Sequence, residues 1–303
     1  MRIFEQVDFK FINSRKIGYM ISSALLIVSI ASIAVKGLEL GIDFKGGMEF
    51  VIEADQALDP TAVRSTLGTV LSTEPEVKSF DQTGLLIRTL NEGEITEVVN
   101  RITDTIEAAN PGVTLSVEKT DIVGPRFAED LKRGAIYSII GGLLVIFVYI
   151  LIRFEWTFAV GAVSALFHDV LLTLGLFSIL AGVLPFSLQV DQSIIAAFLT
   201  IVGYSLNDTV VVFDRIREYS GIFKSEKLEA VVNKSINSTL SRTVITSSTT
   251  LLVVAVLFIF GGEVLRGFAF ALIVGVLVGT YSSIFVASPV VVELKLRNAG
   301  GRK

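Results

Sequence analysis

TIVGYSLNDTVVVFDRIRE, residues 200–218, is an apolar run of membrane-spanning length that contains Asn207 and Asp208. The run ends abruptly in charged residues, of which Asp214 is the first. A carboxylate at membrane depth costs about 2.5–3.5 kcal/mol on insertion scales, so it needs a partner, a proton or a path for water. Asp208 is therefore the first candidate for a functional residue.

The composition indicates a membrane protein. The chain has 303 residues, is 51% hydrophobic and only 18% charged, and has a mean hydropathy of +0.68, which is too apolar for an ordinary soluble domain. Its net charge of −4 gives no indication of nucleic-acid binding. With no cysteine and one histidine, thiol chemistry and Cys/His metal sites are excluded. Nucleotide-binding and serine-hydrolase motifs are also missing, so we predict neither enzyme activity nor a cofactor.

The apolar runs predict six transmembrane helices. The first is read as a retained helix and not as a signal peptide, because it starts late and no small-residue cleavage site follows. Lys and Arg collect in cytoplasmic flanks, and their distribution predicts that both termini lie in the cytoplasm; Lys132, Arg133 and Arg266 are exceptions. The predicted spans are 17–35, 134–152, 157–181, 192–213, 241–260 and 267–290.

Residues 37–123 differ from the rest, because charge rises and the apolar runs shorten. The predicted order of elements, β-α-β-β-α-β, is the ferredoxin-like split βαβ pattern, so we expect a soluble domain outside the cytoplasm, between the first two spans. The predicted elements are strands at 48–53, 77–80, 85–90 and 113–118 and helices at 61–71 and 94–109. The expected division is 1–36, 37–123, 124–292 and 293–303: N-terminus with first helix, outer domain, remaining helices, and cytoplasmic tail.

Asp208 lies about two helical turns before Arg215, so roughly 10 Å deeper in the membrane. Gly203 and Asn207 share one face of the same helix, where they would allow a neighbouring helix to approach closely. If the fourth and fifth spans are antiparallel, Arg242 should lie level with Asp208. Two alternatives follow: Asp208 transfers a proton and Arg242 pairs with it, or Asp208 ties two helices together and Arg242 marks the membrane boundary.

Further polar residues lie inside the spans. Thr246 belongs to a hydroxyl-rich stretch that follows Arg242 and could line a wet path. His168 and Asp169 are adjacent within the third span. They could relay protons, because histidine titrates near neutrality, or they could form a hydrogen-bonded pair that holds two helices in register.

Two glycine-containing segments stand where the chain passes between membrane and outer domain. GIDFKGG, residues 41–47, contains Gly41, Asp43, Gly46 and Gly47, and VGP on the return side contains Gly124 and Pro125. Because glycine adopts backbone shapes closed to other residues, we interpret both segments as hinges or junctions. A phosphate-binding loop is not expected, because no helix follows the first segment.

Five stretches together resemble the SecF family of bacterial protein-export membrane proteins, part of the SecD/SecF group in the RND superfamily. They are GIDFKGG at 41–47, VGP at 123–125, FHD at 167–169, GYSLNDTVVVFDRIRE at 203–218 and LSRTVITSSTT at 240–250. The resemblance covers nearly the whole chain. Phe127-Ala128 is a departure, since the family more often has a glycine there.

The resemblance implies more than the residues themselves. It implies one half of an RND-type bundle, with SecD supplying the other half. It also implies a role in late preprotein export, driven by the proton gradient, with SecYEG and SecA and with YajC and YidC as further partners. The family's membrane carboxylate and arginine correspond to Asp208 and Arg242. Two other functions stay open: half of an RND-type small-molecule or lipid exporter, or a passive scaffold of a membrane complex.

Overall fold

The computed structural model describes residues 8–80, 82–184 and 186–300. Two compact units make up the chain. The helical unit contains residues 1–38, 138–179 and 194–303, and the sheet unit contains residues 39–137 and 180–193. The first residues of the predicted cytoplasmic N-terminus, with Arg2, and the last residues of the tail, with Arg302 and Lys303, lie outside the described residues.

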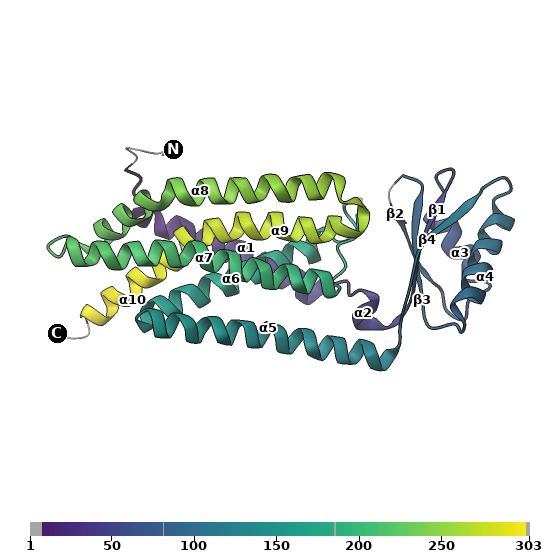
Figure 1. The fold of residues 1–303 in the computed structure, drawn as a ribbon, viewed down its shortest axis with the longest axis horizontal. Helices are drawn as coiled ribbons and strands as arrows, with labels where there is room; N and C mark the ends of the chain where they lie inside the picture. Colours follow the sequence, from purple (N-terminus) through teal and green to yellow (C-terminus); the bar gives the residue numbers. More distant parts are fainter. Residues whose placement is uncertain (1–7, 81, 185, 301–303) are drawn as a thin grey trace. The chain divides into compact units, whose positions relative to one another are not determined.

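Six helices of the described chain are long and apolar enough to cross a membrane, which confirms the predicted number of spans. Figure 1 shows those of the helical unit side by side. They are α1 (Arg15–Lys36), α5 (Pro125–Arg153), α6 (Trp156–Leu180), α7 (Gln192–Ile222), α8 (Leu228–Phe260) and the sixth span, built from α9 (Gly262–Ser282), η2 (Ser283–Ala287) and α10 (Ser288–Gly300).

Several helices run beyond the predicted spans. α7 continues to Ile222 and α8 begins at Leu228, so residues 214–240, between the predicted fourth and fifth spans, are mostly helical. The charged residues there do not interrupt the helices. In the sixth span the turn Ser283–Ala287 is a π-helix, closed by a hydrogen bond from the Ser288 N–H to the Ser283 carbonyl.

The segment before α1 is fixed by amide side chains of α8. Asn233 Oδ1 accepts a hydrogen bond from the Ile12 N–H at 2.9 Å. Asn237 accepts from the Phe9 N–H at 3.1 Å and donates to the Phe9 carbonyl at 2.8 Å. Ile12, in the 3-10 turn η1 (Phe11–Ser14), is completely buried. Residues 9–12 are thus tied to α8, and Ile12 is part of the core of the helical unit.

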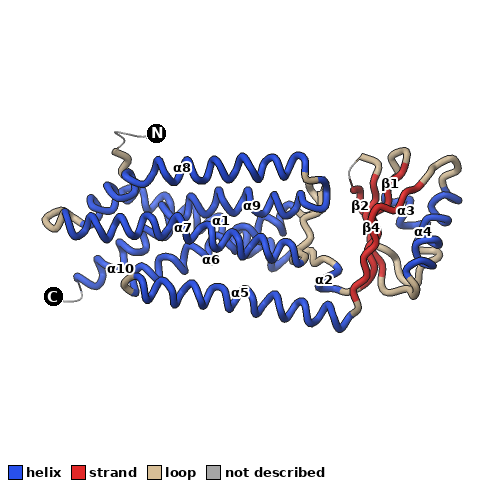
Figure 2. Tube along the Cα trace, viewed as in Figure 1, coloured by secondary structure: helices blue, strands red, loops and turns tan. Residues whose placement is uncertain are grey.

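The sheet unit contains the predicted ferredoxin-like fold. Its sheet is antiparallel throughout and has the order β2-β3-β1-β4, which is what two interlocked βαβ units produce. Figure 2 shows helices α3 and α4 on one face of this sheet. The elements are α2 (Ile42–Lys45), β1 (Gly47–Ala54), α3 (Pro60–Leu67), β2 (Glu76–Phe80), β3 (Gly84–Thr89), α4 (Ile95–Ala109) and β4 (Leu115–Val123).

Local sequence explains the helix positions in this domain. The Asp59 side chain accepts from the Thr61 N–H at 2.9 Å, and Pro60 occupies the first turn of α3, as expected of a capped start. Val98, Ile102 and Ile106 form the buried stripe of α4. They pack with Phe50 and Ile52 of β1 in one core. β4 is longer than predicted, because it pairs with β1 along its whole length up to Gly47–Val123.

Candidate functional site

Asp208 lies buried in the bundle, with 5% of its surface exposed. Its Oδ1 accepts a hydrogen bond from Thr243 Oγ1 of α8 at 3.0 Å. Its Oδ2 is buried and has no hydrogen-bond partner among the described residues. A buried carboxylate oxygen without a donor is uncommon and calls for an explanation, such as a proton or a water molecule.

Arg242 lies level with Asp208, as predicted, because its neighbour Thr243 contacts the carboxylate. The guanidinium itself is exposed on the bundle surface, and within the described chain it forms no ion pair with Asp208. Thr246 is turned toward its own helix, since its hydroxyl donates to the carbonyls of Arg242 at 2.9 Å and Thr243 at 3.0 Å. Thr243 is therefore the direct partner that the sequence did not single out.

More hydroxyl groups continue from this position toward the sixth span. Tyr204, on α7, donates to Ser247 Oγ of α8 at 3.3 Å, and Ser247 shares a 2.7 Å hydrogen bond with Thr280 of α9. Asn207 and Gly203, by contrast, are exposed on α7. They form, with Ala196 and Thr200, a strip of small and polar residues that this chain leaves uncovered.

A second buried network centres on Asp169 of α6. Its Oδ1 lies 2.9 Å from His168 Nδ1. Its Oδ2 accepts from Ser205 of α7 at 2.6 Å and from Ser282 of α9 at 2.7 Å. His168 Nε2 lies 3.1 Å from the hydroxyl of Ser22 on α1. The pair predicted as a relay or a tie thus connects four helices, all at buried positions.

The predicted junction residues meet in the sheet unit. A Cβ on Gly46 would stand 3.3 Å from the Val123 carbonyl and 3.4 Å from Pro125 Cα, so the two glycine-containing segments lie against each other. Gly46 and Gly47 have φ of +75° and +124°, which other residues rarely adopt. A single helical turn, α2, lies within the first segment, and strand β1 follows it. Pro125 begins α5 directly after Gly124.

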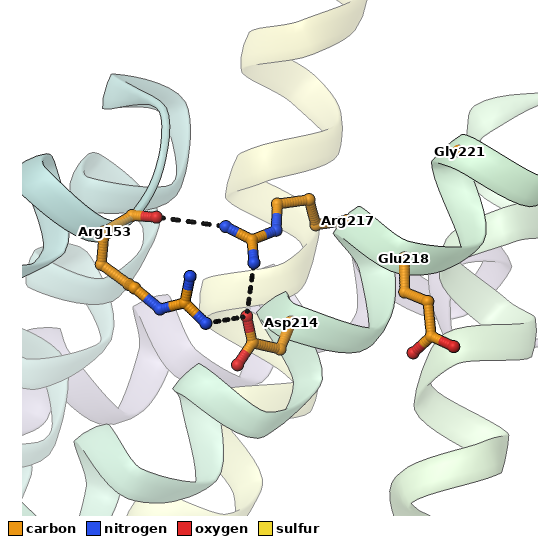
Figure 3. A pocket seen from close by; sticks show the side chains of 5 residues that line it. All are labelled: Arg153, Asp214, Arg217, Glu218 and Gly221. Carbon is orange, nitrogen blue, oxygen red and sulfur yellow. Dashed lines mark hydrogen bonds and ion pairs between the residues drawn. The ribbon is translucent and has the colours of Figure 1, made fainter.

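A pocket of about 610 Å³ lies at the end of α5 and α7, and Asp208 is not among its lining residues (Figure 3). Asp214 Oδ1 contacts both Arg153 and Arg217 at 3.3 Å, and Arg217 also donates to the Arg153 carbonyl at 3.2 Å. Both guanidinium groups lie over the Phe154 ring. These side chains are 42–49% exposed, so each pair contributes at most about 1 kcal/mol.

Six spanning helices, a buried carboxylate beside hydroxyl groups and a ferredoxin-like domain between the first two spans define a multi-pass membrane protein of the transport class. The family model described as protein export membrane protein SecD/SecF, C-terminal, matches residues 103–297. The SecD/SecF GG motif matches residues 31–58, which include Gly41, Gly46 and Gly47 of the first junction. The chain belongs to the SecD/SecF family of protein-export membrane proteins.

Two relatives carry the same name, protein translocase subunit SecF. The protein of Rhodothermus marinus is 66% identical over 100% of this chain and 98% of its own length. That of Rhodobacter capsulatus is 40% identical over 96% of this chain and 90% of its own length. The family is therefore that of a membrane subunit in protein translocation, and a small-molecule exporter is not favoured.

A solved structure supports the same fold. The crystal structure of SecDF from Thermus thermophilus, described as a translocon-associated membrane protein, matches with a TM-score of 0.86 and 35% identity. A second structure, SecDF in a super-membrane-facing form, matches with a TM-score of 0.72 and 33% identity. Each match covers 98% of this chain, which spans only 40% of the SecDF chain.

Proposed function

We propose that the chain is a subunit of Sec-dependent protein export in which a proton bound and released at Asp208 drives movement of the outer domain. The observation that carries the proposal is the Asp208 carboxylate, buried in a spanning helix with one oxygen hydrogen-bonded to Thr243 and the other without a partner among the residues that the structure describes. Such a group can exist charged or neutral, and its preferred helix contacts differ between the two states.

The available energy suits such a role. One charge that crosses about 100 mV releases about 2.3 kcal/mol, and each pH unit adds about 1.4 kcal/mol. The free energy released by one proton is therefore enough to shift an equilibrium between two arrangements of the helices modestly. Arg242 would take part when α7 and α8 rearrange, with Asn207 on the adjoining face and His168, Asp169 and Thr246 as additional candidates for a relay.

The partner that fits best is SecD, as the complementary six-helix half. The uncovered strip of Ala196, Thr200, Gly203 and Asn207 would allow close contact with another helix. SecYEG, SecA, YajC, YidC and the translocating preprotein are the further partners we propose. We also propose that the chain lies in the bacterial inner membrane with both termini in the cytoplasm. The domain boundaries we propose are 36/37, 123/124 and 292/293, and the glycine-containing segments are the junctions.

The test is export into proton-loaded membrane vesicles that contain the complete complex. Asp208→Asn keeps size and polarity but cannot ionise, so it should abolish the gradient-dependent part of export and leave co-purification with SecD unchanged. The matched control is Glu218→Gln, which neutralises an exposed carboxylate on the same helix. Export at the normal rate in Asp208→Asn would refute proton coupling, and a loss of assembled complex would favour the scaffold role.

A further inference from the structure

The connection between α6 and α7 packs against the first junction segment, far away in sequence. The Gly41 N–H donates to the Val190 carbonyl at 2.9 Å, and the Val190 N–H donates to the Glu39 carbonyl at 2.7 Å. Leu40 and Val190 form a parallel bridge. Leu188, Gln189 and Val190 are only 3–5% exposed. The connection is therefore an integral part of the sheet unit.

Asp43 holds the end of this connection. Its Oδ2 accepts a hydrogen bond from the Gln192 N–H at 2.9 Å, and Gln192 is the first residue of α7. The first N–H groups of a helix have no partner within the helix, and a carboxylate there is favoured by the helix dipole. The Asp43 side chain thus satisfies a group that α7 itself cannot satisfy.

A charged network links the same connection to the body of the domain. Gln189 Nε2 donates to Glu76 Oε1 of β2 at 3.4 Å. Lys78, on the same strand, contacts Glu76 at 2.9 Å and Glu39 at 2.5 Å. Three segments are therefore connected pairwise by hydrogen bonds and ion pairs: residues 39–43, residues 188–192 and strand β2.

We propose that Asp43 is a positioning residue that fastens the start of α7 to the outer domain. Displacement of α7 would then reach the domain through residues 188–192, in addition to the two places where the chain passes into and out of it. Asp208 lies 16 residues after Gln192 on the same helix, about 24 Å along its axis. This part of the inference depends on the proposed proton coupling, whereas the fastening itself does not.

Hydrogen exchange in the full chain tests the fastening without any export assay. In Asp43→Ala the Gln192 amide should exchange about tenfold faster, since a hydrogen bond to a charged acceptor is lost. Asp43→Asn keeps an oxygen acceptor and should stay close to the wild-type rate. Asp104→Ala, which removes an exposed carboxylate of α4, is the control. Unchanged exchange at Gln192 in Asp43→Ala would overturn the proposal.

A disulfide tests whether the fastening stays closed during transport. The chain has no cysteine, and a Cβ on Gly41 would lie 3.1 Å from the Asp191 Cβ, near the separation of about 3.5–4.5 Å in disulfides. We expect Asp43→Ala to lower gradient-dependent export about fivefold. When Gly41→Cys and Asp191→Cys are added to the Asp43→Ala variant and oxidised, the disulfide should restore export. The reduced form of this variant and the two single cysteine variants are the controls.

Three results separate the possible failures. If the oxidised pair stops export in an otherwise wild-type chain, the connection must detach and the proposal is wrong. If Asp43→Ala exports normally while Asp208→Asn does not, proton coupling stands but the route through Asp43 fails. If Asp208→Asn exports normally, proton coupling fails, and the exchange of the Gln192 amide still decides whether Asp43 fastens α7.

Discussion

Asp169 and Asp208 are both carboxylates buried in spanning helices, but their oxygens are satisfied differently. Both oxygens of Asp169 have partners, one in His168 and the other in two serine hydroxyls. Asp208 has one donor and a second oxygen with none in the described structure. A fully bonded carboxylate is suited to holding helices together. The incompletely bonded one is the better candidate for gaining a proton.

Glu76 supplies a pH-dependent prediction outside the membrane. Burial acts to raise its pKa, but the hydrogen bond and charge of Lys78, with smaller contributions from Arg88 and Lys45, lower it below the ordinary value of 4.5. Its contribution to stability is therefore complete above pH 4.5 and disappears as the pH falls through the lowered pKa. Glu76 is 37% exposed, so the effect is about 1 kcal/mol or less.

The measurement is thermal unfolding of the full chain with Glu76→Gln. At pH 7 the variant should unfold at a lower temperature than the wild type, and the difference should vanish at pH values below the lowered pKa of Glu76. Glu118→Gln is a suitable control, since Glu118 is an exposed carboxylate that accepts a hydrogen bond from Ser116. A difference that grows on acidification would contradict the prediction.

At the scale of elements, periodicity and hydropathy predicted the six spans and the βαββαβ order. Helix ends could not be predicted in the same way, because α7 and α8 continue as helices after their sequence turns polar. Hydropathy reports where a helix leaves lipid, not where its backbone hydrogen bonding stops. Asp208 and Asp169 could be identified from their types and positions, whereas Thr243, Ser205 and Ser282 could not, because their roles depend on which helices face each other.

Contact between α1 and α6 depends on a small residue. A Cβ on Gly175 would stand 2.1 Å from the Ser29 Cβ, and both residues are buried. Gly175→Ala should therefore push the helices apart and lower stability by about 1–3 kcal/mol, measured by thermal unfolding in detergent. Gly141→Ala on α5, where the added methyl meets no atom within 4 Å in the described part of the chain, should be neutral or stabilising. Equal behaviour of the two variants would refute a close α1–α6 contact.

For the molecule as a whole, large apolar surfaces are left uncovered. Only 6% of the most apolar window of α5 is buried, against 50% for α6. Lipid can cover apolar side chains, but Asn207 and Thr200 on α7 are polar and exposed. This chain also spans 40% of the SecDF chain that it matches. These observations suit a molecule that completes its bundle with a second protein.

Gly203→Leu tests that surface. A Cβ on Gly203 meets no atom of the described residues within 4 Å, so the larger side chain should leave the fold intact. It should nevertheless weaken co-purification with SecD about tenfold, because it would hold a partner helix away from the strip. Gly141→Leu, an equally open position on α5, is the control. If both variants retain SecD equally well, the partner lies on another face.

The π-turn at Ser283–Ala287 determines which way the end of the sixth span faces. Ser282, before it, bonds Asp169 of α6, while Val291, after it, lies where a Cβ on Gly161 of the same helix would meet it at 2.8 Å. Nine residues of regular α-helix rotate by about 900°, which would leave these two side chains on opposite sides. The π-turn contains one residue more than an α-helical turn, so the rotation from Ser282 to Val291 falls to about 800°. The two side chains then lie about 80° apart around the helix axis, on the same side of the helix. One irregular turn thus allows the sixth span to contact α6 at two places, through the hydrogen bond to the Asp169 carboxylate and through the close approach of Val291 to Gly161.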